Sequence, residues 1–259
     1  MKFIFKIILQ YYLKYLTKLV LIFHRPIVIA VIGSTNKTFI KEEINRQLKQ
    51  KNFSVRANPK SFNTEIGLPL AILNLPSGYN LYLAWLPIIF QAFFAIFDFN
   101  FPKILILELG VSVPGDIKYL LGIFKPKIAI VADINQRYLE SFADMDELMG
   151  EYEELVKNLP KTGLAILNYD NTRVRSLAKL ARAKVNFFGL TSTQPSASEY
   201  WQITKISKTT TGQIAEVKHG DQITTYQLNR FGQHHLYVLL ATLAAVDYLP
   251  RYLKRPAVK

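Results

Sequence analysis

Residues 27–42, IVIAVIGSTNKTFIKE, decide the fold that this sequence predicts. The apolar, largely β-branched run Ile27–Ile32 predicts a strand buried on both faces, because no residue in it prefers water. A loop of small polar residues, 33–38, follows it, and a helical pattern begins at Phe39. In such a unit, backbone N–H groups and the helix N-terminus face an anion, while a lysine and a hydroxyl serve the outer phosphates and Mg²⁺. The stretch therefore predicts a phosphate-binding loop.

The loop departs from the strict phosphate-binding motif at two positions. The motif has glycine immediately before the lysine, where this chain has Asn36, and another glycine five residues earlier, where it has Val31. Asparagine tolerates a left-handed backbone, so we expect the loop to keep its shape. The alternative interpretation is an ordinary strand-to-helix turn that is capped by Ser34 or Thr35.

Composition limits the classes of protein and of partner. The chain has 259 residues, half of them apolar and 13% aromatic, which predicts a sizeable core and excludes global disorder. The net charge of +13 favours an anionic partner such as a nucleotide, a nucleic acid or an anionic lipid. Nucleic acid is the least favoured of these, because the basic residues are scattered without an aromatic–basic platform. The absence of cysteine excludes disulfides and thiolate metal sites.

The N-terminal residues 1–24 are apolar but interrupted by lysines, and they contain no uncharged span of about 20 residues. Apolar residues recur at helical spacing, namely Leu9, Tyr12, Leu13, Leu16, Leu19 and Val20. This pattern predicts a basic amphipathic helix on an anionic membrane surface, and hence a cytoplasmic protein that is peripheral to the inner face of the plasma membrane. The alternative is a helix that packs on the domain.

A second apolar tract, residues 67–97, carries no charge and is interrupted by Pro69, Pro76 and Pro87. The prolines disfavour a single membrane-spanning helix. We expect residues 85–97 to form a surface helix that faces a membrane or a partner. The alternative is a buried helix.

Later segments alternate between strand and helix patterns. The run Ile104–Glu108 predicts a second buried strand, whose terminal carboxylate suits the Mg²⁺ of a nucleotide. The remaining expected strands are 127–133, 163–170 and 184–190, and the expected helices are 114–124, 138–158 and 172–183. Residues 199–228 alternate like an antiparallel meander, and 235–249 form an apolar helix.

The predicted fold class is α/β. A P-loop-type, mostly parallel sheet is flanked by helices, with a small antiparallel meander near the C-terminus and an amphipathic N-terminal helix. The predicted domains are the helix 1–24, an ATP-binding domain 25–250 and a basic tail 251–259.

Two further groups of side chains contain residue types that can bind metals. His234 and His235 are adjacent on a predicted helix, where neighbours point apart, so capping or surface roles are favoured over a metal site. Six acidic residues fall within 144–154 and predict a solvated helix face.

Together these segments resemble the central, ATP-binding domain of the Mur ligase family, closest to the branch that adds D-alanyl-D-alanine to the peptidoglycan precursor. The similarity runs in order from about Arg25 to Leu249. The segments that carry it are Gly33-Ser34, Lys37-Thr38, Lys41-Glu42, Phe62-Asn63, Glu65–Pro69, Glu108–Gly110, Pro114-Gly115, Leu139-Glu140, Phe142, Leu159-Pro160, Gly163, Leu167-Asn168, Asp170-Asn171, Gly232, His234 and Tyr237.

The resemblance implies a reaction and a set of site residues. ATP would phosphorylate a carboxylate of a nucleotide-sugar peptide, and an amine would attack the acyl phosphate to form an amide. Lys37 would meet the β- and γ-phosphates, and Thr38 and Glu108 would hold Mg²⁺. The other residues assigned to ATP are Gly33, Ser34, Thr35, Asn36, His234 and His235, and those assigned to the substrate cleft are Asn63, Thr64 and Glu65.

Several positions depart from the family pattern. Tyr138 stands where the family has a histidine near a second metal, and Tyr152 stands where it has a carbamylated lysine. His235 takes the place of the asparagine that meets adenine. The chain also lacks recognisable nucleotide-sugar and amine-binding domains, so a separate amine-binding domain or protein is expected as a partner. Three hypotheses follow: an ATP-dependent ligase, a degenerate nucleotide-binding or membrane-surface scaffold, and a truncated reading frame.

Overall fold

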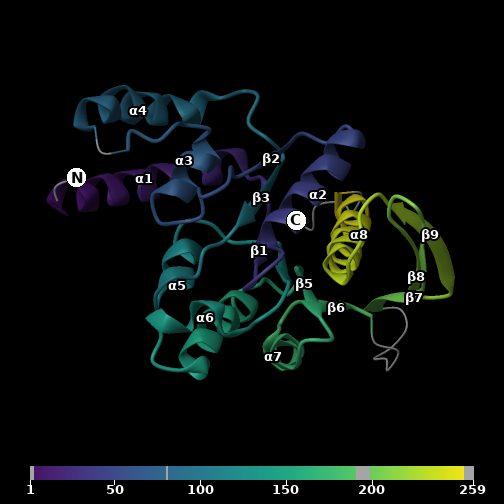
Figure 1. Ribbon diagram of the computed structural model, residues 1–259. Coiled ribbons are helices and arrows are strands. Elements are labelled where there is room, and N and C mark those ends of the chain that lie inside the picture. The colour runs from purple at the N-terminus through teal and green to yellow at the C-terminus, as the bar shows by residue number, and fades with distance from the viewer. Residues whose placement is uncertain (1–2, 80, 191–198, 254–259) are drawn as a thin grey trace.

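The computed structural model describes residues 3–79, 81–190 and 199–253, which are organised around one nine-stranded sheet (Figure 1). The strand order is β2-β3-β1-β4-β5-β6-β7-β8-β9. Strands β2 to β7 pair in parallel, and β7, β8 and β9 continue the same sheet as an antiparallel meander. The bounds are β1 Ile27–Ile32, β2 Val55–Ala57, β3 Ile104–Glu108, β4 Ile128–Val131, β5 Leu164–Asn168, β6 Lys184–Gly189, β7 Tyr200–Lys208, β8 Gln213–His219 and β9 Gln222–Leu228. The predicted α/β class, with its mostly parallel sheet and C-terminal meander, is confirmed.

Helices cover both faces of the sheet. Alternate side chains of β1 enter two separate cores, Val28, Ala30 and Ile32 on one face and Ile29 and Val31 on the other. This explains why the strand has no polar residue. The first core packs against α1 (Phe3–His24), α3 (Gly67–Leu73), α4 (Tyr82–Phe94), α5 (Asp116–Leu121), α6 (Met145–Lys157) and α7 (Thr172–Ser176), and the second against α2 (Lys37–Gln50) and α8 (Gln233–Leu253).

Three helix boundaries differ from the prediction for local reasons. Helix α2 begins two residues before Phe39, because Asn36 adopts the left-handed conformation (φ 60°) and acts as its N-cap. The predicted helix 138–158 is divided into a 3₁₀ segment, η2 (Gln136–Ser141), and α6. The Asp144 side chain accepts the backbone N–H of Glu147 and so starts a new helix. The predicted helix 172–183 is likewise divided into α7 and the 3₁₀ segment η3 (Leu177–Leu180).

The two apolar tracts form surface helices. Helix α1 packs on the domain through Leu9, Leu13, Leu16 and Val20, so the packing interpretation is confirmed, while its opposite side is exposed. Helix α4 continues into the 3₁₀ segment η1 (Ala95–Phe97) and buries only one side. Pro87 lies inside α4, as the prediction of a helix over residues 85–97 requires. Among the described residues, no helix combines the length and the apolar character that a membrane span needs.

Two predictions concern segments at the ends of the chain that the structure describes only in part. Helix α8 continues through Leu253, and so includes the first residues of the predicted basic tail. The rest of that tail, residues 254–259, lies outside the described residues, as do residues 1–2 of the predicted N-terminal helix.

Strand β1 is the point at which the order of strands in the sheet changes direction: β2 and β3 are added on one side of it and the later strands on the other. Strand β3 lies on one side of it and β4 on the other, and all three strands are parallel. Their carboxyl ends therefore meet at one edge, where ligands of open α/β sheets bind. The segments that follow these ends are the loop 33–38 after β1, Glu108 at the end of β3, and Asp133 after β4.

Candidate functional site

Gly33 sets the shape of the loop that follows β1. Its φ of +152° disfavours a side chain, and a Cβ there would lie 3.0 Å from the Cβ of Ala132 and 3.1 Å from the backbone nitrogen of Asp133. Asn36 closes the loop with a left-handed φ of 60°. The expectation that asparagine preserves the turn is therefore confirmed. The loop ends on the N-terminus of α2, a 14-residue helix whose first N–H groups can face an anion.

Thr38 and Glu108 join the loop to the end of β3. The Thr38 hydroxyl donates a hydrogen bond to Glu108 Oε2 at 3.0 Å. The sheet register pairs Glu108 with Val31, and this pairing brings the carboxylate to the first turn of α2. A hydroxyl and a carboxylate are hard oxygen ligands, the kind that Mg²⁺ prefers. The donor set therefore fits the predicted Mg²⁺ position, with two protein ligands and the remainder from phosphate and water.

Lys41 already neutralises the same carboxylate. Its Nζ lies 3.3 Å from Glu108 Oε2 and donates to the backbone oxygen of Asn58 at 2.8 Å. Both side chains of the ion pair are nearly inaccessible, with exposed fractions of 2% for Lys41 and 11% for Glu108. A cation bound between Thr38 and Glu108 would share this carboxylate with Lys41.

Asn58 fixes the backbone of Glu108 by a double hydrogen bond. Its Oδ1 accepts the N–H of Glu108 at 2.8 Å, and its Nδ2 donates to the carbonyl of Glu108 at 3.1 Å. The sequence reasoning missed this residue. The available signal was its place directly after β2, a strand that ends at the same edge of the sheet.

Lys37 folds back over the loop. Its Nζ donates to the carbonyl of Gly33 at 2.5 Å and lies 5.1 Å from the ring centroid of Tyr138. The side chain is buried. To meet a phosphate, it would exchange the Gly33 carbonyl for a phosphate oxygen.

A carboxylate that follows β4 occupies the donors of Thr35 in the loop, which the sequence reasoning did not anticipate. Asp133 accepts the N–H of Thr35 at 2.7 Å and its hydroxyl at 2.9 Å, and it also accepts Asn135 Nδ2 at 3.0 Å. An anion of the chain itself thus lies where the loop would receive a phosphate oxygen. The signal that could have revealed it is its place next to β4, the strand that pairs with β1.

Comparison with known proteins now identifies the family. Residues 87–246 match the family described as Mur ligase middle domain. The chain belongs to the Mur ligase family. A UDP-N-acetylmuramoyl-tripeptide–D-alanyl-D-alanine ligase of Rickettsia prowazekii is 32% identical over 168 residues, which cover 63% of this chain and 32% of that protein. The corresponding ligase of Buchnera aphidicola is 31% identical over 144 residues, or 56% of this chain and 26% of that protein.

Solved structures of Mur ligases share the fold. The MurF ligase of Thermotoga maritima, solved in complex with ADP, superposes with a TM-score of 0.72 at 24% identity, covering 92% of this chain and 49% of that one. MurF of Acinetobacter baumannii also gives a TM-score of 0.72, at 18% identity, with coverage of 92% and 46%. The chain thus spans a quarter to a half of the length of these Mur ligases.

Two tyrosines stand where the resemblance to Mur ligases implies metal-site residues. Tyr138 lies beside Lys37, and Tyr152 is completely buried near Ser34 and Asp133. Burial raises the pKa of Tyr152 to about 12, so its phenol is neutral at pH 7. A neutral phenol cannot replace a carbamate as a metal ligand. Among the described residues, no group of three or more His, Asp or Glu side chains could hold a metal ion.

The predicted substrate residues line a small hollow beside the end of β3. Asn63, Thr64 and Glu65 contribute to it, and its volume is about 110 Å³. The Gly110 N–H donates to the carbonyl of Asn63 at 3.0 Å, which connects this loop to the chain after β3. Glu65 forms an ion pair with Lys6 of α1 at 3.0 Å.

The two histidines contact each other, so the prediction that they point apart is wrong. Their ring centroids are 3.9 Å apart, because both rings lean from the first turn of α8 toward Phe39 on α2, at 6.5 and 6.1 Å. His235 lines a cavity of about 760 Å³ between α2, β9 and α8. Burial, with contributions from His234 and Arg230, lowers the pKa of His235, so the neutral imidazole is favoured.

The acidic helix α6 is not wholly solvated, as the sequence had suggested. Glu151 is buried and accepts the N–H groups of Gly115 at 2.6 Å and of Ile117 at 2.8 Å. These N–H groups lie at the start of α5, where the helix itself provides no acceptor for them. A carboxylate at this position also complements the helix dipole. Glu151 therefore has a structural role between two helices.

Proposed function

We propose that this chain is the ATP-binding part of an ATP-dependent carboxylate–amine ligase in the synthesis of a peptidoglycan precursor. One observation carries the proposal, namely the 3.0 Å hydrogen bond that joins Thr38, at the end of the phosphate loop, to Glu108 at the end of β3. The Thr38 hydroxyl and the Lys37 ammonium, which come from one segment, thereby share an edge of the sheet with a carboxylate 70 positions beyond Thr38. Membership of the Mur ligase family supports the same chemistry.

Each residue has a role in that reaction. Residues 33–36 would receive the phosphates on backbone N–H groups once Ser34 and Thr35 exchange their hydrogen bonds to Asp133 for phosphate oxygens. Lys37 would neutralise charge on the transferred phosphoryl group. Thr38 and Glu108 would hold Mg²⁺, which supplies charge neutralisation when bound. The substrate carboxylate would take the γ-phosphoryl group with release of ADP. An amine would then displace phosphate from the acyl phosphate and form an amide.

The relatives suggest the substrate class. They are ligases of a UDP-N-acetylmuramoyl-tripeptide and D-alanyl-D-alanine, so a nucleotide-sugar peptide is the proposed carboxylate donor. The hollow at Asn63, Thr64 and Glu65 would form part of its cleft. The amine would be bound by a further domain or a separate protein, in the cytoplasm at the inner face of the membrane.

A second candidate is nucleotide binding without turnover. Tyr152 favours it, because a buried neutral phenol stands at a position that the resemblance assigns to a metal-binding carbamate. Asp133 favours it as well, since its carboxylate occupies the donors of Thr35.

Two measurements separate the candidates. The melting temperature of the protein is followed as ATP·Mg²⁺ is added, because a ligand that binds only the native state raises it. A free ligand concentration of 100 times the dissociation constant adds about 2.7 kcal/mol to the free energy of unfolding. Lys37→Ala should abolish this rise, and the exposed Lys51→Ala is the matched control. The absence of any rise at millimolar nucleotide would refute both candidates.

The second measurement is ADP release with UDP-N-acetylmuramoyl-tripeptide and D-alanyl-D-alanine present. Release that depends on Lys37 supports the ligase. A Lys37-dependent thermal shift without ADP release, from this chain alone and with any separately supplied amine-binding part, would leave the non-catalytic candidate.

A further inference from the structure

Helix α1 presents an apolar stripe to solvent. The residues of this stripe follow one another at intervals of three or four, which places them on one side of the helix. They are Ile4, Ile8, Tyr11, Tyr15, Leu19 and Ile22, and each is about half exposed or more, up to 71% for Ile4. The opposite side of the same helix enters the core, so the stripe is a second apolar face that the domain does not use.

Helix α4 and the following η1 carry a similar stripe. Its members are Leu83, Leu86, Phe90, Phe93, Phe94 and Phe97, with exposed fractions from 51% for Phe93 to 81% for Leu83. Trp85, Ile88 and Ala92 on the other side of α4 are buried. Single exposed apolar residues are common, whereas a continuous row of six marks a surface that binds something.

The two stripes face the same way. Phe5 of α1 packs edge-on against Tyr82 of α4 with ring centroids 5.2 Å apart, and the Tyr12 hydroxyl donates to the carbonyl of Ile89 at 2.9 Å. These contacts progress in the same direction along both helices, so α1 and α4 run parallel. An α-helix turns by about 100° per residue. This rotation places the contacting residues of each helix between its buried side and its exposed stripe. The stripes therefore form one surface, here called the α1–α4 face.

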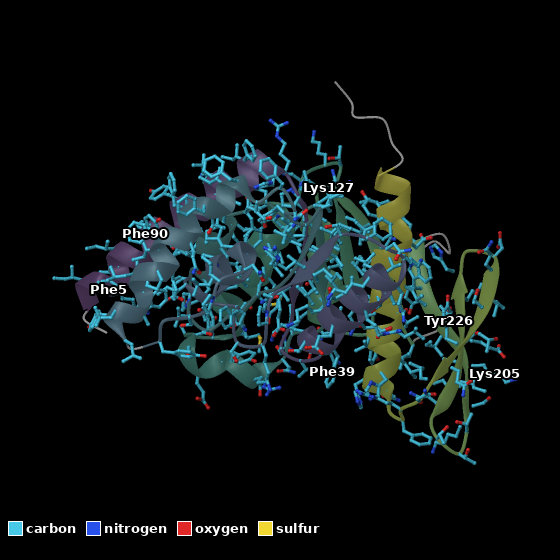
Figure 2. The ribbon with its side chains drawn as sticks, turned by 90° about the horizontal axis from the view of Figure 1, so that it is seen from above. Phe5, Phe39, Phe90, Lys127, Lys205 and Tyr226 are labelled. Carbon is cyan, nitrogen blue, oxygen red and sulfur yellow. The ribbon has the colours of Figure 1, made fainter. Side chains whose placement is uncertain are left out.

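The α1–α4 face stands at one end of the molecule. Figure 2 shows Phe5 and Phe90 together at that end, far from Lys205 and Tyr226 of the meander. The face also lies on the side of the sheet opposite α2.

Charge on the helices of this face is of one sign. Residues 3–24 and 82–97 contain Lys6, Lys14 and Lys18 and no aspartate or glutamate. Lys14 lies over the ring of Tyr119 at 4.1 Å, whereas Lys18 is exposed beside the stripe on the edge away from α4. An apolar surface with a basic edge suits the boundary between the acyl chains and the phosphates of an anionic bilayer.

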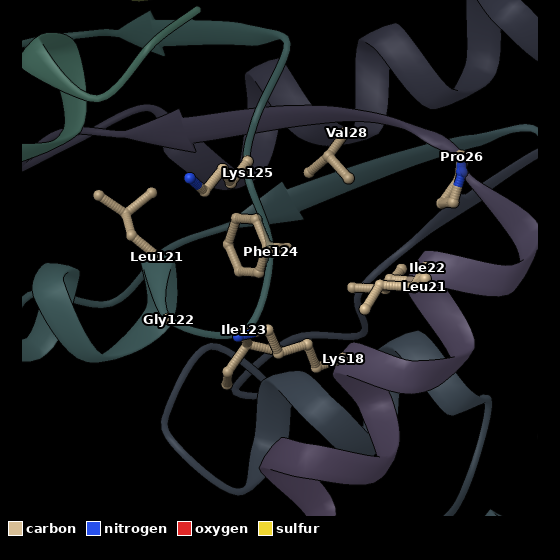
Figure 3. A pocket seen from close by; sticks show the side chains of 10 residues that line it. All are labelled: Lys18, Leu21, Ile22, Pro26, Val28, Leu121, Gly122, Ile123, Phe124 and Lys125. Carbon is tan, nitrogen blue, oxygen red and sulfur yellow. The ribbon is translucent and has the colours of Figure 1, made fainter.

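A cavity adjoins the end of the stripe. It has a volume of about 430 Å³ and lies between the C-terminal part of α1 and the segment that follows α5 (Figure 3). Ile22 belongs both to the stripe and to the cavity wall, and Phe124 forms part of the apolar interior. Lys18 and Lys125 are the charged residues of its lining, and both are exposed. The cavity can thus receive a lipid phosphate and the start of an acyl chain.

We propose that the α1–α4 face docks the protein on an anionic phospholipid bilayer, with the cavity at Lys18 and Lys125 receiving a lipid headgroup. A second copy of the chain is a poorer occupant, because neither helix of this face carries a carboxylate that could pair with the lysines of the other copy. The proposal does not depend on nucleotide binding, so each can fail without the other.

The test is co-flotation of the full chain with vesicles of phosphatidylcholine alone and of phosphatidylcholine with 30% phosphatidylglycerol. Point substitutions are used because Leu13 and Val20 anchor α1 in the core, so removing the helix would unfold the domain. Phe90→Asp changes the face, and Lys18→Glu changes its basic edge. Ile223→Asp is the matched control, since Ile223 is 59% exposed on β9, outside the face.

We expect the protein to bind the anionic vesicles. Added salt should weaken this binding, and free glycerol phosphate should not compete with it. Phe90→Asp should lower the partition coefficient at least about tenfold. Lys18→Glu should lower it about thirtyfold, because it changes the net charge by two units. Ile223→Asp should bind like the wild type, and all variants should keep the wild-type circular dichroism spectrum.

Three results would overturn the proposal. The first is no binding to the anionic vesicles, and the second is an equal loss in Ile223→Asp. The third is a dimer in sedimentation that Phe90→Asp dissociates, together with no flotation, which would assign the face to a second copy of the chain.

Discussion

Removing the charge of Asp133 should strengthen nucleotide binding. The carboxylate accepts the Thr35 N–H at 2.7 Å, so a phosphate oxygen that used the same N–H would lie about 4 to 5 Å from it. Two unit charges at 4 Å repel by about 1 kcal/mol in water and about 4 kcal/mol at an effective dielectric constant of 20. Because Asp133 is half-buried, we expect Asp133→Asn to gain about 1 to 3 kcal/mol, or roughly 5- to 150-fold in the dissociation constant.

The substitution should leave the fold intact. Asparagine keeps an oxygen that can accept the Thr35 N–H. The Thr35 hydroxyl can turn to accept from the new amide group, so only the Nδ2 of Asn135 meets that group unfavourably. One mismatched hydrogen bond costs about 1 to 2 kcal/mol of the free energy of unfolding, less than the stability of most domains.

The assay is isothermal titration of the wild type and the variant with ATP·Mg²⁺ at one ionic strength. Asp221→Asn is the control, because it removes the same charge from the exposed turn between β8 and β9. An unchanged or weaker affinity in Asp133→Asn would refute the reasoning. Equal strengthening in Asp221→Asn would refute it too, by showing that net charge alone matters.

Three other substitutions test the network around the site and the core beneath it. Lys41→Met should lower the free energy of unfolding in urea by about 3 to 5 kcal/mol, because Glu108 would remain buried without its cation; exposed Lys51→Met should change it by less than about 0.5. Tyr152→Phe should remove a loss of stability at alkaline pH. The pKa of Tyr152 in the folded protein is about 12, above the unfolded value near 10, so its contribution is complete below pH 10 and is lost as the pH rises toward 12, about 3 kcal/mol in all. Glu151→Ala should cost about 1 to 3 kcal/mol by leaving buried donors of Gly115 and Ile117 unpaired, as thermal unfolding would show.

The fold was predictable because its signals are local. The run Ile27–Ile32 and the run Ile104–Glu108 are apolar throughout, and only a strand with helices on both faces accounts for that composition. The convergence of Thr38 and Glu108 followed from the same reasoning, because parallel strands end at one edge. Helix boundaries were less certain, since a single capping side chain such as Asp144 moved one of them.

The finer structure of the site was not predictable, because it depends on contacts between distant segments. Asp133 reaches Thr35 across 98 positions, and Asn58 reaches Glu108 across 50. Nothing near Asp133 in the sequence distinguishes it from any acid at the end of a strand. The pairing of β1 with β4 decides that it meets the phosphate loop. Glu151 was misassigned for the same reason, since its partners belong to another helix.

The charged groups of the site are compensated by one another. Lys37 donates to Gly33, Lys41 pairs with Glu108, and Asp133 accepts from Thr35. Binding of a magnesium nucleotide would therefore exchange these partners for new ones, and its affinity is the difference between the two sets. Lys41 keeps the carbonyl of Asn58 in either state, so sharing Glu108 costs it only one of two contacts. Asp133 gains no such replacement, because its carboxylate would face a phosphate. Asp133 would thus limit the affinity for the nucleotide, and for this reason its neutralisation, rather than a change at Lys41, should raise that affinity.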